Sequence, residues 1–243
     1  MRRSRSLDTG KRRRTKRETQ AAKSQRAIAL AERLARLYPT VECPLTHDNT
    51  FELLVAVILS AQCTDAAVNK VTPALFHRYS DPQVLADAPI ADIEALIRTL
   101  GLFRAKAKSL KRCARQLVDE FNGRVPSTMA ELTRLAGVGR KTANVIRGHA
   151  FAIPGIAVDT HCGRLSRRLG LTRNLDPEKV ENDLARLLPP NEWTGFSHRL
   201  IIHGRRVCFA RKPACGKCAL SELCPSREIS SSSSELVSEK ATA

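Results

Sequence analysis

The chain has 243 residues, which is enough for one sizeable hydrophobic core or two small ones. Its formal net charge of +17 favours a polyanionic partner. No apolar run reaches the length of a membrane-spanning helix, which excludes a helical membrane protein. Eight cysteines without a preceding apolar signal segment argue against an extracellular disulfide scaffold, so we expect a soluble protein of a reducing compartment.

The positive charge is distributed unevenly along the chain. Residues 1–26 contain eleven Lys and Arg against two acidic residues, a net +9, and the remaining residues carry +8. The folded part is therefore basic as well, which suits a DNA-binding surface. Residues 1–23 hold too few apolar side chains to fold, and we expect a disordered basic tail, which is either a non-specific DNA tether or a solvated tail without a function. A mitochondrial transit peptide is the less favoured alternative.

Apolar periodicity, cap residues and prolines divide the rest of the chain into short helices. Apolar residues recur at helical spacing from Ser24 to Tyr38, and Phe51–Leu59 is apolar on most sides, which predicts a central position in a core. Thr64 caps another helix, which we expect Pro73 to break. Further helices are predicted from Asp81-Pro82 onward and over Ile90–Thr99, Lys106–Phe121, Met129–Leu135, Arg140–Phe151, Asp159–Leu169, Asp176–Leu188 and Glu192–Val207.

The helical patterns leave no room for a sheet. No segment shows the sustained alternation of polar and apolar residues that marks a β-strand, so we predict an all-α protein. Residues 227–243 are rich in serine and weakly acidic, and we expect a disordered end there.

The stretch from Leu135 to His161 carries the chemistry of the chain. Gly137-Val138-Gly139 is typical of a tight turn between two helices, and its glycines let the backbone approach another group closely. Amides at the start of the second helix have no partner inside it, so the turn offers N–H groups to a phosphate. Lys141 lies in the first turn of that helix, where the helix dipole favours a free, nucleophilic amine. Asp159 is placed to cap the next helix with its carboxylate.

Two segments, Leu-Ala-Gly-Val-Gly-Arg-Lys-Thr-Ala-Asn and Ala-Val-Asp-Thr-His, resemble the helix-hairpin-helix and the downstream aspartate loop of the DNA glycosylase superfamily. Within that superfamily the chain is most similar to the endonuclease III family of bifunctional glycosylases and abasic-site lyases. The resemblance implies that Lys141 is the nucleophile, that Asp159 is its catalytic partner, and that Gly137–Gly139 contacts DNA. This chain has Ala136 where the family usually has proline, which we expect to loosen the turn without changing the chemistry.

Four of the eight cysteines are bunched near the C-terminal end with the spacing C-x6-C-x2-C-x5-C. Four thiolates in so short a loop need a metal, because their charges would otherwise repel. The spacing by itself leaves a zinc site and an iron–sulfur cluster as open alternatives. It resembles the [4Fe-4S] loop of endonuclease III, and the resemblance implies a structural [4Fe-4S] cluster held by Cys208, Cys215, Cys218 and Cys224. The other cysteines are interpreted as ordinary free thiols.

Two further positions take a role from the resemblance. Gln62, in Leu-Ser-Ala-Gln-Cys-Thr-Asp, matches the glutamine that enters the gap left by an extruded base in the family. Leu102, in Gly-Leu-Phe-Arg, resembles the wedge that the family inserts at a kinked base step. From the residues alone, Gln62 is an ordinary residue before a helix cap, and Leu102 is equally well a helix-capping hydrophobic contact.

The resemblance covers about residues 26–226 and implies two helical lobes with a cleft between them. Residues 43–153 would form the helix-hairpin-helix domain, and the N-terminal helix, over 24–42, would join residues 154–226 in the cluster domain. The implied function is base-excision repair. The protein would flip an oxidised or ring-damaged pyrimidine out of duplex DNA, release it through a lysine Schiff base, and nick the strand 3′ to the abasic site by β-elimination.

The same motifs allow two alternative functions. An adenine glycosylase of the superfamily shares the cysteine loop but lacks the lysine after the hairpin and carries a further C-terminal domain. A non-catalytic DNA-binding protein with a redox-sensing cluster has no need of Lys141 and Asp159 together. We expect a monomer that binds damaged double-stranded DNA and no membrane, located in a bacterial cytoplasm with the nucleoid, or in the nucleus or mitochondrion if the source is eukaryotic.

Overall fold

The computed structural model describes residues 18–227, and every regular element in that range is a helix. The predicted all-α fold is therefore confirmed for these residues. Residues 1–17 and 228–243, which make up most of the two predicted tails, lie outside the described residues. The helices are α1 (Gln20–Leu37), α2 (Thr50–Leu59), α3 (Asp65–Arg78), α4 (Pro82–Asp87), α5 (Ile90–Ile97), α6 (Phe103–Phe121), α7 (Met129–Leu132), α8 (Arg140–Ala150), α9 (Thr160–Arg168), α10 (Pro177–Ala185) and α11 (Trp193–Arg206), with short 3-10 turns at Pro190–Glu192, Cys215–Lys217 and Ser221–Leu223.

Side-chain caps fix where several helices begin, as the sequence predicts. Asn49 caps α2, Thr64 caps α3 and Asp81 caps α4, each by accepting a hydrogen bond from the backbone N–H three residues further on. The three bonds are 3.0–3.2 Å long. In the described part of the chain, no helix is long and apolar enough to cross a membrane.

Most helix ends lie within three residues of the prediction, and the larger differences concern α1 and α3. α1 begins at Gln20, four residues before the predicted start, because Thr19 Oγ1 accepts a hydrogen bond from the N–H of Ala22 and so caps an earlier turn. The expectation that Pro73 breaks its helix is wrong, since Pro73 lies inside α3. Proline removes one backbone hydrogen bond there, but α3 buries Val68 and Leu75 on either side of it, and this packing holds the helix together.

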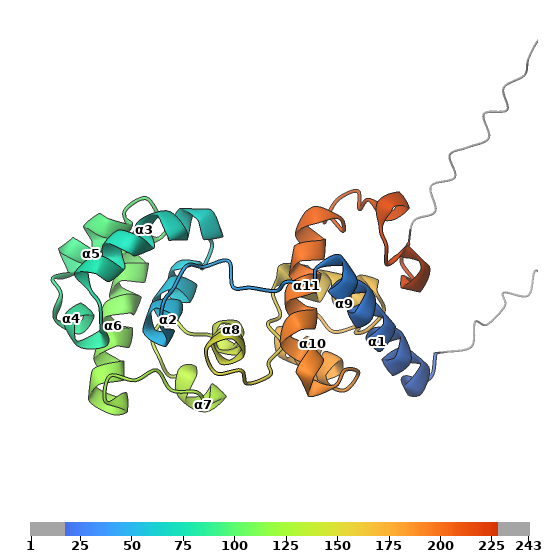
Figure 1. The fold of residues 1–243 in the computed structure, drawn as a ribbon, viewed down its shortest axis with the longest axis horizontal. Helices are drawn as coiled ribbons and strands as arrows, with labels where there is room; N and C mark the ends of the chain where they lie inside the picture. Colours follow the sequence, from blue (N-terminus) through green and yellow to red (C-terminus); the bar gives the residue numbers. More distant parts are fainter. Residues whose placement is uncertain (1–17, 228–243) are drawn as a thin grey trace, which may run out of the picture.

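The larger core is built around α2. Phe51 and all residues of 53–59 are buried, because the helix is apolar on nearly every side and is enclosed by α3, α6 and α8. Helices α4 and α5 pack on α6 and close the far side (Figure 1). Apolar residues of the hairpin, Leu135 and Val138 among them, belong to the same core. The predicted turn is therefore anchored to a rigid group of helices.

A second, smaller core joins the two ends of the described chain. Leu30 and Leu34 of α1 pack with Leu165 of α9, Leu184 of α10 and Phe196 of α11. The chain passes between the two groups of helices along residues 38–49 and again along 151–159 (Figure 1). As a result, α8 and the segment that leads into α9 lie where the two cores meet.

Candidate active site and cluster site

The turn between α7 and α8 requires glycine at its first position. Gly137 has φ +83°, and a Cβ placed on it would lie 3.1 Å from both Ile58 of α2 and Ser109 of α6. Any other residue would therefore be strained and crowded against the core. Val138 is buried, and its N–H donates to the Leu135 carbonyl at 3.1 Å, which closes the turn.

Gly139 has a different function in the same turn. It is the N-cap residue of α8 and offers no side chain to the first amides of that helix. A Cβ on Gly139 would meet no atom within 4 Å, so the space in front of it is open. Free helix amides, open space and the positive end of a helix dipole together suit a phosphate group.

Ala136 makes a contact that a proline could not make. Its N–H donates to Gln116 Oε1 at 2.8 Å, and Gln116 Nε2 donates to the Arg134 carbonyl at 3.0 Å. Gln116 lies on α6, so the oxygen and the nitrogen of its side-chain amide both attach the hairpin to the larger core. The expected loosening of the turn by Ala136 is offset by this pair of hydrogen bonds.

Lys141 and Asp159 line one cavity of about 370 Å³ between the two cores. Lys141 is exposed and lies in the first turn of α8. Asp159 is the N-cap of α9, as predicted, and its Oδ1 accepts a hydrogen bond from the N–H of Cys162 at 2.8 Å. The remaining walls come from residues 42–45, from the end of α2 and the turn after it, and from α3, α8 and α11. The fold therefore brings an amine and a carboxylate, 18 positions apart in the sequence, to one concave site.

His198 lies in this cavity and was missed by the sequence analysis. Burial lowers the pKa of His198 to about 4, and the nearby charges of His149, Lys141 and Arg205 act in the same direction, whereas Asp159 acts against them. His198 Nε2 lies 3.4 Å from His149 Nε2. A histidine in the middle of α11 has no local sequence signal, so only the fold identifies it as a wall of the site.

Ion pairs join the two groups of helices at the cavity and next to it. Arg205 of α11 contacts Asp65 of α3 with an N–O distance of 3.2 Å. Arg140, next to Lys141, contacts Glu181 of α10 at 2.7 Å. The first pair ties α11 to α3 and the second ties α8 to α10, so both connect the two groups of helices around the site.

Gln62 and Leu102 do not line the cavity that holds Lys141 and Asp159. Both are exposed, and both have left-handed backbone conformations, with φ 57° and 59°. Leu102 is 60% exposed although it is a large apolar residue. The structure thus places the two residues on projecting loops of the larger core, with their side chains free to meet another molecule.

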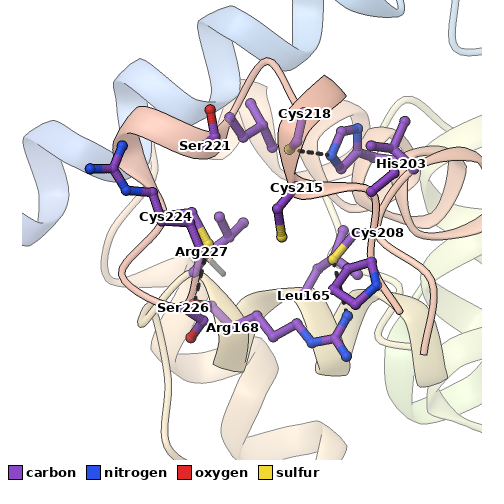
Figure 2. Close-up of a pocket in the computed structure, with 15 residues that line it drawn as sticks. Leu165, Arg168, His203, Cys208, Cys215, Cys218, Ser221, Cys224, Ser226 and Arg227 are labelled. Carbon is purple, nitrogen blue, oxygen red and sulfur yellow. Dashed lines mark hydrogen bonds between the residues drawn. The ribbon is translucent and has the colours of Figure 1, made fainter. Parts of the chain in front are cut away.

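The cysteines of the predicted cluster site surround one small cavity. Figure 2 shows the four side chains, all from the segment that follows α11, arranged around a common space. Burial raises the pKa of Cys218 and of Cys224, so positive charge is needed to hold these sulfurs as thiolates. Iron or zinc supplies that charge. Four soft sulfur donors around one space fit an iron–sulfur cluster. The set comprises Cys208, Cys215, Cys218 and Cys224.

Two side chains lie within hydrogen-bond distance of these sulfurs. Arg168 Nη1 lies 3.3 Å from Cys208 Sγ and also donates to the Phe209 carbonyl. His203 Nε2 lies 3.3 Å from Cys218 Sγ (Figure 2). The other ring nitrogen of His203, Nδ1, lies 3.0 Å from the Tyr38 hydroxyl. Such donors offset the negative charge of thiolates and fix the loop that carries them.

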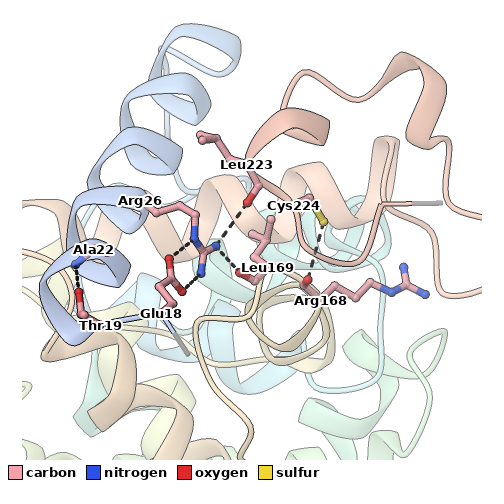
Figure 3. Close-up of polar contacts among 8 residues, drawn as sticks. All are labelled: Glu18, Thr19, Ala22, Arg26, Arg168, Leu169, Leu223 and Cys224. Carbon is pink, nitrogen blue, oxygen red and sulfur yellow. Dashed lines mark hydrogen bonds and ion pairs between the residues drawn. The ribbon is translucent and has the colours of Figure 1, made fainter. Parts of the chain in front are cut away.

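The N-terminal helix holds the far end of the cysteine loop. Arg26 of α1 donates to the carbonyls of Leu169 at 2.5 Å and Leu223 at 3.3 Å, and its guanidinium is paired with Glu18 (Figure 3). Cys224 follows Leu223 directly. The hydrogen bonds of Arg26 thus connect α1, near the start of the described chain, to the cysteine loop near its end.

Comparison with known proteins agrees with this geometry. Residues 55–190 match the model of the HhH-GPD superfamily of base-excision DNA repair proteins, and residues 208–224 match the iron–sulfur binding domain of endonuclease III. Endonuclease III of Synechocystis sp. is 53% identical over 211 residues, covering 86% of this chain and 96% of that protein. Endonuclease III of Escherichia coli K12 is 41% identical, covering 79% and 90%. A trapped endonuclease III–DNA covalent intermediate superimposes with a TM-score of 0.79 at 45% identity, covering 84% and 96%.

The fold, the glycine hairpin at the junction of two helical cores and the superfamily match define a helix-hairpin-helix DNA repair enzyme. The cysteine loop and the relatives narrow that class, and the chain belongs to the endonuclease III family. It is a DNA-binding glycosylase and abasic-site lyase that carries a [4Fe-4S] cluster.

Proposed function

We propose that Lys141 is the nucleophile of a reaction on damaged pyrimidines in duplex DNA. Its amine attacks C1′ of the sugar, and the glycosidic bond breaks as the base leaves with the bonding electrons. The nitrogen loses its protons to nearby bases, and the C1′–O4′ bond breaks with O4′ taking a proton, so the sugar ring opens to a Schiff base between Lys141 and C1′. The Schiff base then permits β-elimination, in which a proton leaves C2′ and the bond from C3′ to its phosphate oxygen breaks. The observation that carries this proposal is the shared cavity of Lys141 and Asp159.

Asp159 supplies a negative charge next to the sugar. As the base departs, positive charge develops at C1′, and a fixed carboxylate stabilises it without moving. The same group can take the proton that Lys141 must lose when it forms the new bond. One oxygen of Asp159 is committed to the Cys162 amide, so the carboxylate is held in a single orientation.

The hairpin and the two exposed loops would bind the DNA around the lesion. The open α8 amides at Gly139 suit a phosphate, with Gly137 and Val138 forming the turn that presents them. Gln62 would enter the gap left by the flipped base, and Leu102 would fill stacking space at the kinked step. Their exposure and their placement outside the catalytic cavity support these separate functions.

We assign the cluster to Cys208, Cys215, Cys218 and Cys224, because their sulfurs line one cavity. When bound, the cluster supplies four iron–sulfur bonds that cross-link residues 208–224. All four donors are cysteines, so no position stays open for substrate and the contribution is to folding. Basic residues on this loop, Arg211 and Lys217 among them, then form part of a surface for DNA phosphates.

The setting of the enzyme follows from the same features. A cavity built from the two cores of a single chain needs no second copy, which supports a monomer acting on double-stranded DNA. The relatives from bacteria support a cytoplasmic protein that works at the nucleoid.

A duplex with one abasic site tests the proposal. The wild-type protein should nick this strand, and Lys141→Ala should bind the duplex with similar affinity but leave it intact. Lys108→Ala, which removes an exposed lysine of α6 outside the cavity, is the matched control and should nick normally. Binding without nicking by the wild-type protein would instead support a non-catalytic DNA-binding protein.

A further inference from the structure

Two strained loops of the larger core project side chains toward solvent. Gln62 and Leu102 both have positive φ, a conformation that is costly for residues other than glycine. Such strain persists only where neighbouring contacts hold the backbone in place. The loops are 40 positions apart in the sequence, so contacts within each loop cannot set the distance between them.

One side-chain pair connects the two loops. Lys106 Nζ donates a hydrogen bond to Cys63 Sγ over 2.8 Å. Cys63 directly follows Gln62, and its own N–H donates to the Ser60 carbonyl at 3.1 Å. Lys106 lies in the first turn of α6, where its N–H donates to the Leu102 carbonyl at 3.0 Å. Each partner is thus fixed by its backbone to one loop and by its side chain to the other.

The burial of Lys106 shows that the contact is costly to form. The residue is only 5% exposed, and its neighbour Ala107 is fully buried. Burying an ammonium costs free energy unless its hydrogen bonds are made, and within residues 18–227 its recorded acceptor is Cys63. An aliphatic residue would fill the space, but it could not hold the Gln62 loop.

We propose that Lys106 and Cys63 are positioning residues that fix Gln62 and Leu102 at one separation, so that both enter the duplex at a lesion together. The proposal rests on the proposed function, in that it takes Gln62 and Leu102 to be the residues that enter DNA. Neither Lys106 nor Cys63 lines the cavity of Lys141 and Asp159. The pair therefore acts on lesion recognition, while bond breaking depends on other groups.

The test uses a duplex that carries a stable tetrahydrofuran abasic analogue opposite 2-aminopurine, whose fluorescence rises when it loses its stacking partners. Lys106→Met keeps the length of the side chain and removes its donor. The variant should reduce the ratio of affinities for this duplex and for undamaged DNA about tenfold, which corresponds to the loss of one hydrogen bond to a charged group. The rise in 2-aminopurine fluorescence should also be smaller. On a cleavable abasic duplex the loss should fall mainly on KM.

Substitutions at Cys63 keep the test valid even if Lys106→Met fails to fold. Cys63→Ala removes the acceptor and should reproduce the loss, and Cys63→Ser, which restores an acceptor oxygen, should recover most of it. The double variant should lose no more than either single variant, because the two residues act through one contact. Lys108→Met, an equal change of charge on the exposed side of α6, should weaken both duplexes alike and leave the preference unchanged.

The outcomes separate this proposal from the proposed function. Wild-type lesion preference in both Lys106→Met and Cys63→Ala would overturn the positioning function while the wild-type enzyme still nicks DNA. Equal loss in Cys63→Ala and Cys63→Ser would also overturn it, since the hydrogen bond would then be irrelevant. Failure of the wild-type protein to nick an abasic duplex would contradict the proposed function instead.

Discussion

The side-chain amide of Gln116 makes two hydrogen bonds to the backbone of the hairpin, one through its oxygen and one through its nitrogen. Gln116→Ala removes the bond from the Ala136 N–H, 2.8 Å long, and the bond to the Arg134 carbonyl, 3.0 Å long. Each neutral hydrogen bond contributes about 1 kcal/mol net, so opening of the turn should become about 2 kcal/mol easier. That free energy corresponds to roughly thirtyfold in the population of the open turn.

Native-state hydrogen exchange of the Ala136 amide measures this opening without unfolding the protein or losing its cluster. The amide should exchange roughly thirtyfold faster in Gln116→Ala. Gln116→Glu keeps an acceptor for the Ala136 N–H but loses the donor to the Arg134 carbonyl. The Ala136 amide of this variant should therefore exchange faster than in the wild-type protein and slower than in Gln116→Ala. Gln83→Ala, which removes an exposed glutamine contact on α4, is the control. An unchanged rate for Ala136 in Gln116→Ala would refute the reasoning.

Three more predictions concern the active site and the cluster. Asp159→Asn keeps the helix cap but loses the negative charge, so base release should slow about a hundredfold. The loss should be smaller on a pre-formed abasic site, and rate measurements on both substrates check this. Cys215→Ser should lower the iron content from roughly four atoms per chain and lower the soluble yield, as iron analysis and visible absorbance will show. The pKa of His198 is about 4 in the folded protein, below its ordinary 6.5. Between these two pH values the unfolded chain binds a proton at His198 that the folded protein does not bind. The free energy of unfolding should therefore fall as the pH drops from about 6.5 to about 4. His198→Gln should flatten that part of a stability–pH profile, and an unaltered profile would contradict it.

The local features of the fold could be predicted because they depend on neighbouring residues. Asp159 caps α9 and Asp176 caps α10 through bonds to amides three positions away, and a short sequence window contains both partners. The central position of α2 followed from its apolar composition alone. Pro73 was misjudged because core packing on both sides of it, which is not local, outweighs one missing hydrogen bond.

The features that escaped prediction join distant parts of the chain. His198 reaches the cavity of Lys141 and Asp159 only because α11 packs beside α9, and Arg26 meets the cysteine loop across nearly the whole sequence. The Lys106–Cys63 contact spans 43 positions, and neither residue type has a spacing that signals it. Periodicity identifies which face of a helix is buried, but it does not identify what that face will contact.

The most direct test of the account is the identity of the amine that bonds to the sugar. Borohydride reduction during turnover on damaged duplex DNA converts the Schiff base into a stable adduct, and mass mapping locates the modified residue. The adduct should map to Lys141 in the wild-type protein and should be absent in Lys141→Ala. A trapped adduct at the wild-type level in Lys141→Ala, or one that maps to another lysine, would contradict the assignment of Lys141 as the nucleophile.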